Sequence, residues 1–306
     1  MKRVSLHFVP LLTLLLSASV TEAFSQKLFT NDGKEIPFAD VTMQGTVVAW
    51  RTKEPSTGND RITNIPAANI TRLDFPEPTD LQEAEALLNR GDAAGAIEKT
   101  ESVIRQFSPF KVTAGSYYVP AVMVKLEGLA LLKKDDEFDK LRAELKGINL
   151  SPSDQLRLTG AEALRSFSKG ILADAEKEVK SILPKTDDAS VLAKLYVLLG
   201  DIQTKQAAYP AALESYLSVS VFYGSQSDQL PRAELGAARS LAKMQRLEDA
   251  RDMLVGLKDR YPTSPQAKTA KEELSAILKT LGQNEAQKAD EAEKAEKTEK
   301  PATDKP

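Results

Sequence analysis

The feature that most constrains the fold is a helical hydrophobic pattern that repeats along most of the chain. Apolar residues follow helical spacing over residues 81–88, a polar break covers 89–93, and a second apolar helical stripe covers 96–104. This unit of about 34 residues then recurs. Corresponding positions of the successive units lie 45, 34, 37 and 38 residues apart, at Ala96, Leu141, Ala175, Ala212 and Ala250. Because one such hairpin cannot bury its apolar face alone, we predict a mainly α fold with about five stacked helical hairpins over 77–282.

The clearest copy of the unit spans residues 193–226. Its characteristic residues are Tyr196 at the fourth position, Leu199 and Gly200 at the seventh and eighth, Ala212 at the twentieth and Tyr216 at the twenty-fourth. This pattern resembles the tetratricopeptide repeat (TPR). In such a repeat, the glycine and alanine let two antiparallel helices approach closely, and the aromatic rings fill the space around them. The segment 260–268 is also similar to the repeat ends of exported bacterial members of this family, such as the Tol–Pal-associated division coordinator and the outer-membrane assembly lipoprotein.

The resemblance implies an α-solenoid whose first helices line a concave groove for a protein or peptide partner. Mapping the inward-facing repeat positions onto this sequence gives the expected groove residues Arg157, Lys194, Val197, Asp201, Arg232, Leu235 and Arg239. The cations among them suit an acidic peptide or a carboxylate, and the apolar neighbours would add affinity. The alternative is that these are ordinary solvated residues of surface helices.

A different pattern covers residues 24–76, where β-forming residues alternate with turn signals. Asn31-Asp32-Gly33 predicts a tight turn, and residues 41–50 are rich in β-formers. We predict a small barrel-like β module of the SH3 or Sm type with four or five short strands, ended by the prolines of 76–78. Trp50, the only tryptophan, is either an anchor for a peptide or glycan or a core residue of this module.

The first 23 residues have the order of a secretory signal. Lys2 and Arg3 form a basic start, leucines dominate residues 11–16, and small or polar residues lead to Ala23. The apolar run is short of the roughly 20 residues that a spanning helix needs, so an uncleaved anchor is the less favoured alternative. We predict cleavage after Ala23, a periplasmic or secreted protein, and no membrane-spanning segment after cleavage.

Composition excludes the commonest catalytic and metal-binding chemistry. The chain has no cysteine, its one histidine is His7 within the expected signal, and its net charge is −3. Histidine is the usual general base and the commonest metal ligand, and a basic surface is what nucleic acid requires. Ser166-Phe167-Ser168-Lys169 has the letters of a serine–lysine nucleophile motif, but one short match without its partner motifs is weak. We expect no catalytic residue, no metal, no cofactor and no nucleic-acid partner.

Residues 283–306 lack aliphatic and aromatic side chains other than alanine, so we predict a charged tail that is disordered beyond a frayed helical start. Together these patterns favour an exported, non-catalytic adaptor that joins proteins at the bacterial cell envelope. The alternative is an accessory protein that binds glycan or peptidoglycan through the amino-terminal β module. The sequence leaves the partner and the oligomeric state open.

Overall fold

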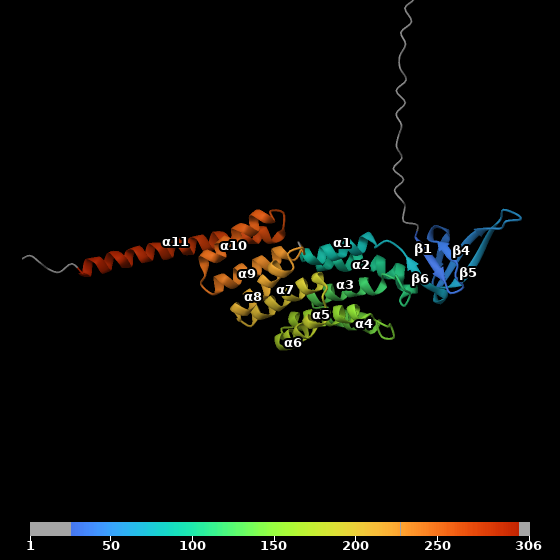
Figure 1. The fold of residues 1–306 in the computed structure, drawn as a ribbon, viewed down its shortest axis with the longest axis horizontal. Coiled ribbons are helices and arrows are strands. Elements are labelled where there is room, and N and C mark those ends of the chain that lie inside the picture. The colour runs from blue at the N-terminus through green and yellow to red at the C-terminus, as the bar shows by residue number, and fades with distance from the viewer. Residues whose placement is uncertain (1–25, 227, 300–306) are drawn as a thin grey trace, which may run out of the picture. The chain divides into compact units, whose positions relative to one another are not determined.

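The computed structural model describes residues 26–226 and 228–299, so the expected signal over residues 1–23 lies outside the described part. The chain divides into two units, which we call the β unit (up to Pro76) and the helical unit (from Glu77). Each is described by itself. The described part is mainly helical with a small amino-terminal sheet region, as the sequence predicts (Figure 1).

The β unit consists of two antiparallel three-stranded sheets. One has the order β2-β1-β6, formed by Glu35–Pro37, Lys27–Thr30 and Ile70–Asp74. The other has the order β3-β4-β5, formed by Val41–Gln44, Val47–Lys53 and Asp60–Pro66. Strand side chains that point inward form the core of this unit, which includes the buried Leu28, Ile36, Val48, Ile70 and Leu73.

The described part of the β unit has six short strands, where the sequence predicts four or five. Two short 3₁₀ helices separate some of them. Phe38–Asp40 separates β2 from β3, and Ala67–Asn69 separates β5 from β6. Pro66 ends β5 because it cannot continue a ladder, and the chain then joins the other sheet. The predicted turn at Asn31-Asp32-Gly33 is present, with Gly33 at φ +83° and the Thr30 amide bonded to the Lys34 carbonyl at 3.0 Å.

The helical unit consists of antiparallel helix pairs that follow one another along the chain (Figure 1). The first helices of the pairs are α1 (Thr79–Arg90), α3 (Tyr118–Leu131), α5 (Pro152–Ser168), α7 (Ala189–Lys205) and α9 (Leu230–Lys243). The second helices are α2 (Ala93–Phe107), α4 (Asp135–Ala143), α6 (Leu172–Ile182), α8 (Tyr209–Phe222) and α10 (Leu247–Arg260). Short 3₁₀ turns at Ser108–Phe110 and Leu183–Lys185 follow α2 and α6. Each first helix also contacts the first helix of the next pair, and α9 contacts the last helix, α11 (Pro265–Glu299).

The turns inside the five helix pairs have the same backbone geometry. Each has one residue in the left-handed region, namely Gly91, Lys133, Gly170, Ala207 and Gln245. In each turn this residue's amide bonds the carbonyl three residues earlier, and the next amide bonds the carbonyl five residues before it. This is the Schellman arrangement, which satisfies the carbonyls at the end of a helix. The residue that follows is already the N-cap of the second helix, so two residues separate α1 from α2 and three residues separate the helices of each other pair.

The contacts of Tyr216 explain why two glycines stand in the middle of helices. Tyr216 is 2% exposed, and its ring packs against the backbone of both Gly200 on α7 and Gly236 on α9. A Cβ at either glycine would overlap the ring. The fully buried Ala212 lies in the same cluster, as the sequence predicts. Tyr196 differs from its expected place, because it stacks on Tyr223 with ring centroids 5.7 Å apart.

Helix α11 continues to Glu299, whereas the sequence predicted a tail from residue 283 that is disordered beyond a frayed helical start. Residues 284–299 consist mostly of alanine, glutamate, glutamine and lysine, which are strong helix formers and need no buried face to favour a helix. Residues 300–306 lie outside the described part. No helix among the described residues is long and apolar enough to cross a membrane.

Candidate functional site

The first helices of the helical unit together line a groove. Each contributes one stripe of side chains at helical spacing, such as Ser190, Lys194, Leu198 and Asp201 on α7. Two adjoining hollows make up the groove, and both are lined by Leu88, Leu131 and Arg232.

The first hollow, here called the α5–α7 pocket, has a volume of about 260 Å³. Its walls come from α1, α3, α5, α7 and the start of α9. The apolar part of the wall includes Leu131, Leu156, Leu164, Val191, Leu195 and Leu198. The second hollow continues past Arg232 to Arg239 and the beginning of α11. The walls of the first hollow also carry polar and charged side chains, among them Glu85, Glu127, Arg157, Asp188 and Lys194. Hollows that combine apolar walls with polar groups are typical of binding sites in proteins.

Hydrogen bonds join the end of α1 to residues about 140 positions further along the chain, just before α9. The Asn89 side-chain amide donates to Asp228 Oδ2 at 2.6 Å, and the Gln229 amide donates to Asn89 Oδ1 at 3.0 Å. Gln229 is only 4% exposed, so its hydrogen bond to Asn89 is partly shielded from water, whereas the bond between Asn89 and Asp228 is exposed. They hold the end of α1 beside the start of α9, which makes α1 part of the groove wall.

Three of the predicted groove arginines already have carboxylate partners on neighbouring helices. Arg157 on α5 pairs with Glu85 on α1 at 3.3 Å and lies 3.9 Å from Glu127 on α3. Arg232 on α9 donates to Asp201 on α7. These charge-assisted pairs join different first helices and stabilise the groove wall. A ligand carboxylate would have to compete with the existing partners of these arginines.

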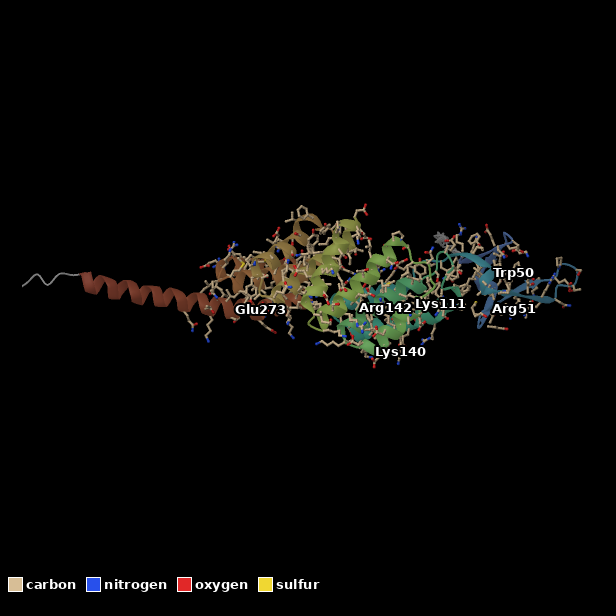
Figure 2. All side chains as sticks on the ribbon, turned by 90° about the horizontal axis from the view of Figure 1, so that it is seen from below. Trp50, Arg51, Lys111, Lys140, Arg142 and Glu273 are labelled. Carbon is tan, nitrogen blue, oxygen red and sulfur yellow. The ribbon has the colours of Figure 1, made fainter. Side chains whose placement is uncertain are left out.

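Arg239 and Tyr216 extend the same bracing. Arg239 donates from Nε and from a terminal nitrogen to Glu273 Oε1 on α11, at 2.9 and 2.6 Å (Figure 2 labels Glu273). The Tyr216 hydroxyl donates to Asp201 Oδ1 at 2.7 Å. Burial raises the pKa of Tyr216, and the charge of Asp201 raises it further, so this hydroxyl stays protonated at physiological pH.

Lys194 is the exception among the predicted cations. It lies on α7, is half-buried and lines the α5–α7 pocket. Within the described part of the chain it has no ion-pair partner, unlike Arg157 and Arg232 in the same pocket. Lys194 is therefore the pocket's available positive charge.

Two other predicted residues take different positions in the helical unit. Val197 does not line the groove. It is 1% exposed and packs in a core cluster with Ala193, Val219 and Leu230, because only one narrow stripe of α7 faces the groove while its other sides pack on α6, α8 and α9. Leu235 lines the second hollow while being 6% exposed and packed against α10 and α11.

Trp50 lies on β4, opposite Val41 of β3 and Thr63 of β5 (Figure 2). It is half-buried and shares a sheet face with the fully buried Val48. This face packs on the unit's own core, which favours the core interpretation of Trp50 over an anchor held out to a glycan.

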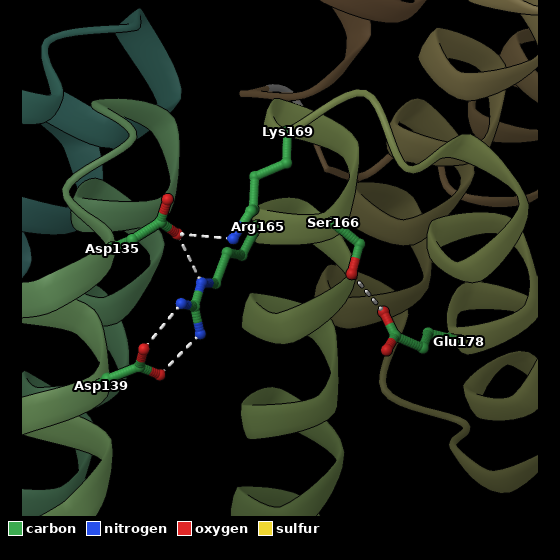
Figure 3. A network of polar contacts seen from close by, with 6 residues as sticks. All are labelled: Asp135, Asp139, Arg165, Ser166, Lys169 and Glu178. Atoms are coloured by element: carbon green, nitrogen blue, oxygen red, sulfur yellow. Dashed lines mark hydrogen bonds and ion pairs between the residues drawn. The ribbon is translucent and has the colours of Figure 1, made fainter.

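The serine–lysine motif has a different role from the one its letters suggest. Ser166 Oγ donates to Glu178 Oε2 on α6 at 3.3 Å, while Lys169 reaches Asp135 on α4 at 3.5 Å in another direction (Figure 3). Arg165 joins the same network through Asp135 and Asp139, and these bonds lower the pKa of both carboxyls. The network ties α4, α5 and α6 together. Among the described residues, no group of three or more histidine, cysteine, aspartate or glutamate side chains is arranged to hold a metal ion.

Sequence reasoning missed the contribution of α1 and α3 to the groove. Glu85, Asn89 and Glu127 carry bracing or closing contacts, and Gly160 lines the pocket from the middle of α5. A glycine in the middle of a helix is unusual, so Gly160 is a signal that could have indicated the contribution of α5 to the pocket. Comparison of the chain with models of known protein families, and with curated proteins, gives no match.

Proposed function

We propose that this chain is an exported, non-catalytic adaptor of the bacterial cell envelope that holds a segment of a partner protein in its groove. The observation that carries the proposal is the groove itself, lined by one stripe from each of five consecutive first helices. A surface built from repeated helices in this way presents an extended concave face, and such faces suit peptide segments.

The proposal includes a TPR-like solenoid of five hairpins. Two features support it: the five identical Schellman turns, and the contact of each first helix with the next. The glycine–tyrosine packing of Gly200 and Tyr216 follows the repeat pattern as well. The amino-terminal unit, with its two three-stranded sheets, would be an SH3-like or Sm-like accessory module.

Export rests on the residues that lie before the described part. The basic start, the leucine-rich run and Ala23 have the order of a secretory signal. Mass spectrometry of the protein purified from its native compartment tests this directly. The proposal predicts a mature chain that begins at Phe24, and an intact Met1 would contradict export by cleavage.

The adaptor function is tested by affinity purification of the tagged, exported protein with reversible crosslinking. Lys194→Glu is the informative variant, because Lys194 has no intramolecular partner in the described chain and its reversal leaves the bracing pairs intact. Lys205→Glu on the exposed side of α7 is the matched control. The proposal predicts one abundant envelope partner that is lost with Lys194→Glu and kept with Lys205→Glu. Equal recovery with both variants would remove the groove from the proposal.

A further inference from the structure

Gly160 occupies a position that the chain's own packing does not require to be glycine. It lies in the middle of α5 and lines the α5–α7 pocket. A Cβ there would meet only Leu195 Cδ2, at an ordinary contact distance of 3.9 Å. Gly200 and Gly236 differ, because a Cβ at either would overlap the Tyr216 ring. Glycine is a poor helix former, so a glycine in mid-helix without a packing reason leaves space for something outside the chain.

The pocket beside Gly160 combines apolar side chains with Lys194, a cation that has no ion-pair partner in the described chain. The carboxylates in its wall are engaged, Glu85 and Glu127 with Arg157 and Asp188 with the first amides of α7. Leu156 and Leu164 stand one turn on either side of Gly160, and Leu195 faces it from α7. Lys194 is the neighbour of Leu195 on α7, and within the described chain it lacks the carboxylate partner that Arg157 and Arg232 each have. A ligand that fits this pocket therefore has an apolar group against the leucines around Gly160 and a negative charge near Lys194.

We propose that the α5–α7 pocket anchors the partner segment by taking one apolar side chain against Gly160, while a carboxylate next to that side chain pairs with Lys194. This inference rests on the proposed function and specifies the chemistry of its partner. The occupant is an extended peptide segment, because the pocket opens into a second hollow that continues along the groove. The volume of about 260 Å³ suits a single side chain with its neighbouring backbone.

The test measures binding of three labelled peptides to the full mature chain by fluorescence anisotropy. The first probe is acetyl-Gly-Ser-Asp-Leu-Asp-Ser-Gly-amide, with a carboxylate on each side of the leucine so that either chain direction can bind. The second replaces both aspartates by asparagine, and the third replaces the leucine by glycine. The proposal predicts that the first probe binds at least about tenfold more tightly than either of the others, the range expected for one charge-assisted contact or one buried side chain. Equal binding of the three probes, or no binding into the millimolar range, would overturn it.

Two variants connect the binding to the named residues. Gly160→Ala should weaken the first probe at least about fivefold while the melting temperature stays equal or rises, because alanine favours the helix and fits beside Leu195. Gly282→Ala, in α11 with open space around it, is the matched control and should leave binding unchanged. Lys194→Gln should lower the affinity for the first probe to that of the asparagine probe, and Lys205→Gln should not. Undiminished binding by Gly160→Ala or Lys194→Gln would refute the assignment.

Failure of this inference and failure of the proposed function are distinguishable. If no probe binds but the envelope partner is still lost with Lys194→Glu, the adaptor function stands and the peptide chemistry assigned here is wrong. If the partner is also recovered equally with Lys194→Glu and Lys205→Glu, both fail.

Discussion

Three of the five turn residues with left-handed backbone are not glycine, and replacing each of them by glycine should stabilise the helical unit. Lys133, Ala207 and Gln245 have φ values of 57°, 59° and 61° and are exposed, so substitution removes no packing. A left-handed conformation disfavours an L residue by about 1–2 kcal/mol, and the greater freedom of glycine in the unfolded chain offsets part of this. The expected gain is therefore about 0.5–1 kcal/mol for each site.

The three sites lie in different helix pairs and share no partner, so their effects should add to about 2 kcal/mol in the triple variant. For a unit of this size that corresponds to a melting temperature about 4–8 °C higher. Urea unfolding followed by circular dichroism measures the gain as a higher midpoint at an unchanged slope.

The matched controls are Gly91→Ala and Gly170→Ala, which have φ values of 89° and 81° with nothing near a Cβ. They should lose stability by about 1 kcal/mol each through backbone strain alone. A triple glycine variant that is no more stable than the parent would refute the claim that the five turns share one geometry.

Three further predictions concern packing, bracing and pH. Gly200→Ala should destabilise the helical unit by about 1–3 kcal/mol in urea unfolding, because its Cβ would overlap the Tyr216 ring; a loss below about 0.5 kcal/mol would contradict that contact. Arg157→Ala should lower the free energy of unfolding by about 0.5–1 kcal/mol because its ion pairs are lost. Lys194→Ala should stay within about 0.5 kcal/mol of the parent in the same assay. Equal losses would contradict the claim that Arg157 stabilises the groove wall while Lys194 does not. Burial raises the pKa of Glu178 above its ordinary 4.5, so ionisation of Glu178 lowers the stability of the folded state as pH rises above that value. Glu178→Gln should therefore be more stable than the parent at pH 7 and lose this advantage below about pH 4.5. A gain in stability that is independent of pH would contradict this.

The helices and their pairing were largely readable from the sequence, because helical spacing and polar breaks are local signals. The turns between paired helices were harder to read for a local reason. Only two of the five turns have glycine at the left-handed position, while Lys133, Ala207 and Gln245 adopt the same backbone without the residue that would mark it.

The groove was only partly readable. Lys194, Asp201 and Arg232 line the two hollows, whereas Val197 lies in the core because α7 is packed on several sides. The pairing of Arg157 with Glu85 joins residues 72 positions apart, and the closure by Asn89 joins residues 140 positions apart. Contacts at such separations follow from the way that successive pairs pack on one another, and no short-range pattern encodes them.

The length of α11 exceeds the short helical start that the sequence predicts. Low hydrophobicity over residues 284–299 predicted disorder, yet a helix needs only backbone hydrogen bonds and favourable propensity, which alanine, glutamate and lysine supply. Composition that rules out a packed core does not rule out a helix.

The most direct test of the central claim is site-specific photocrosslinking in the native envelope. A photoreactive residue at Ser190 would lie exposed on the groove wall, and one at Lys177 would lie exposed on α6, outside both hollows of the groove. The account predicts a single strong crosslinked partner from position 190, abolished by Lys194→Glu in the same chain, and none from position 177. The same crosslinks from both positions, or none from position 190 in cells that make the protein at its normal level, would contradict the claim that the groove holds a partner.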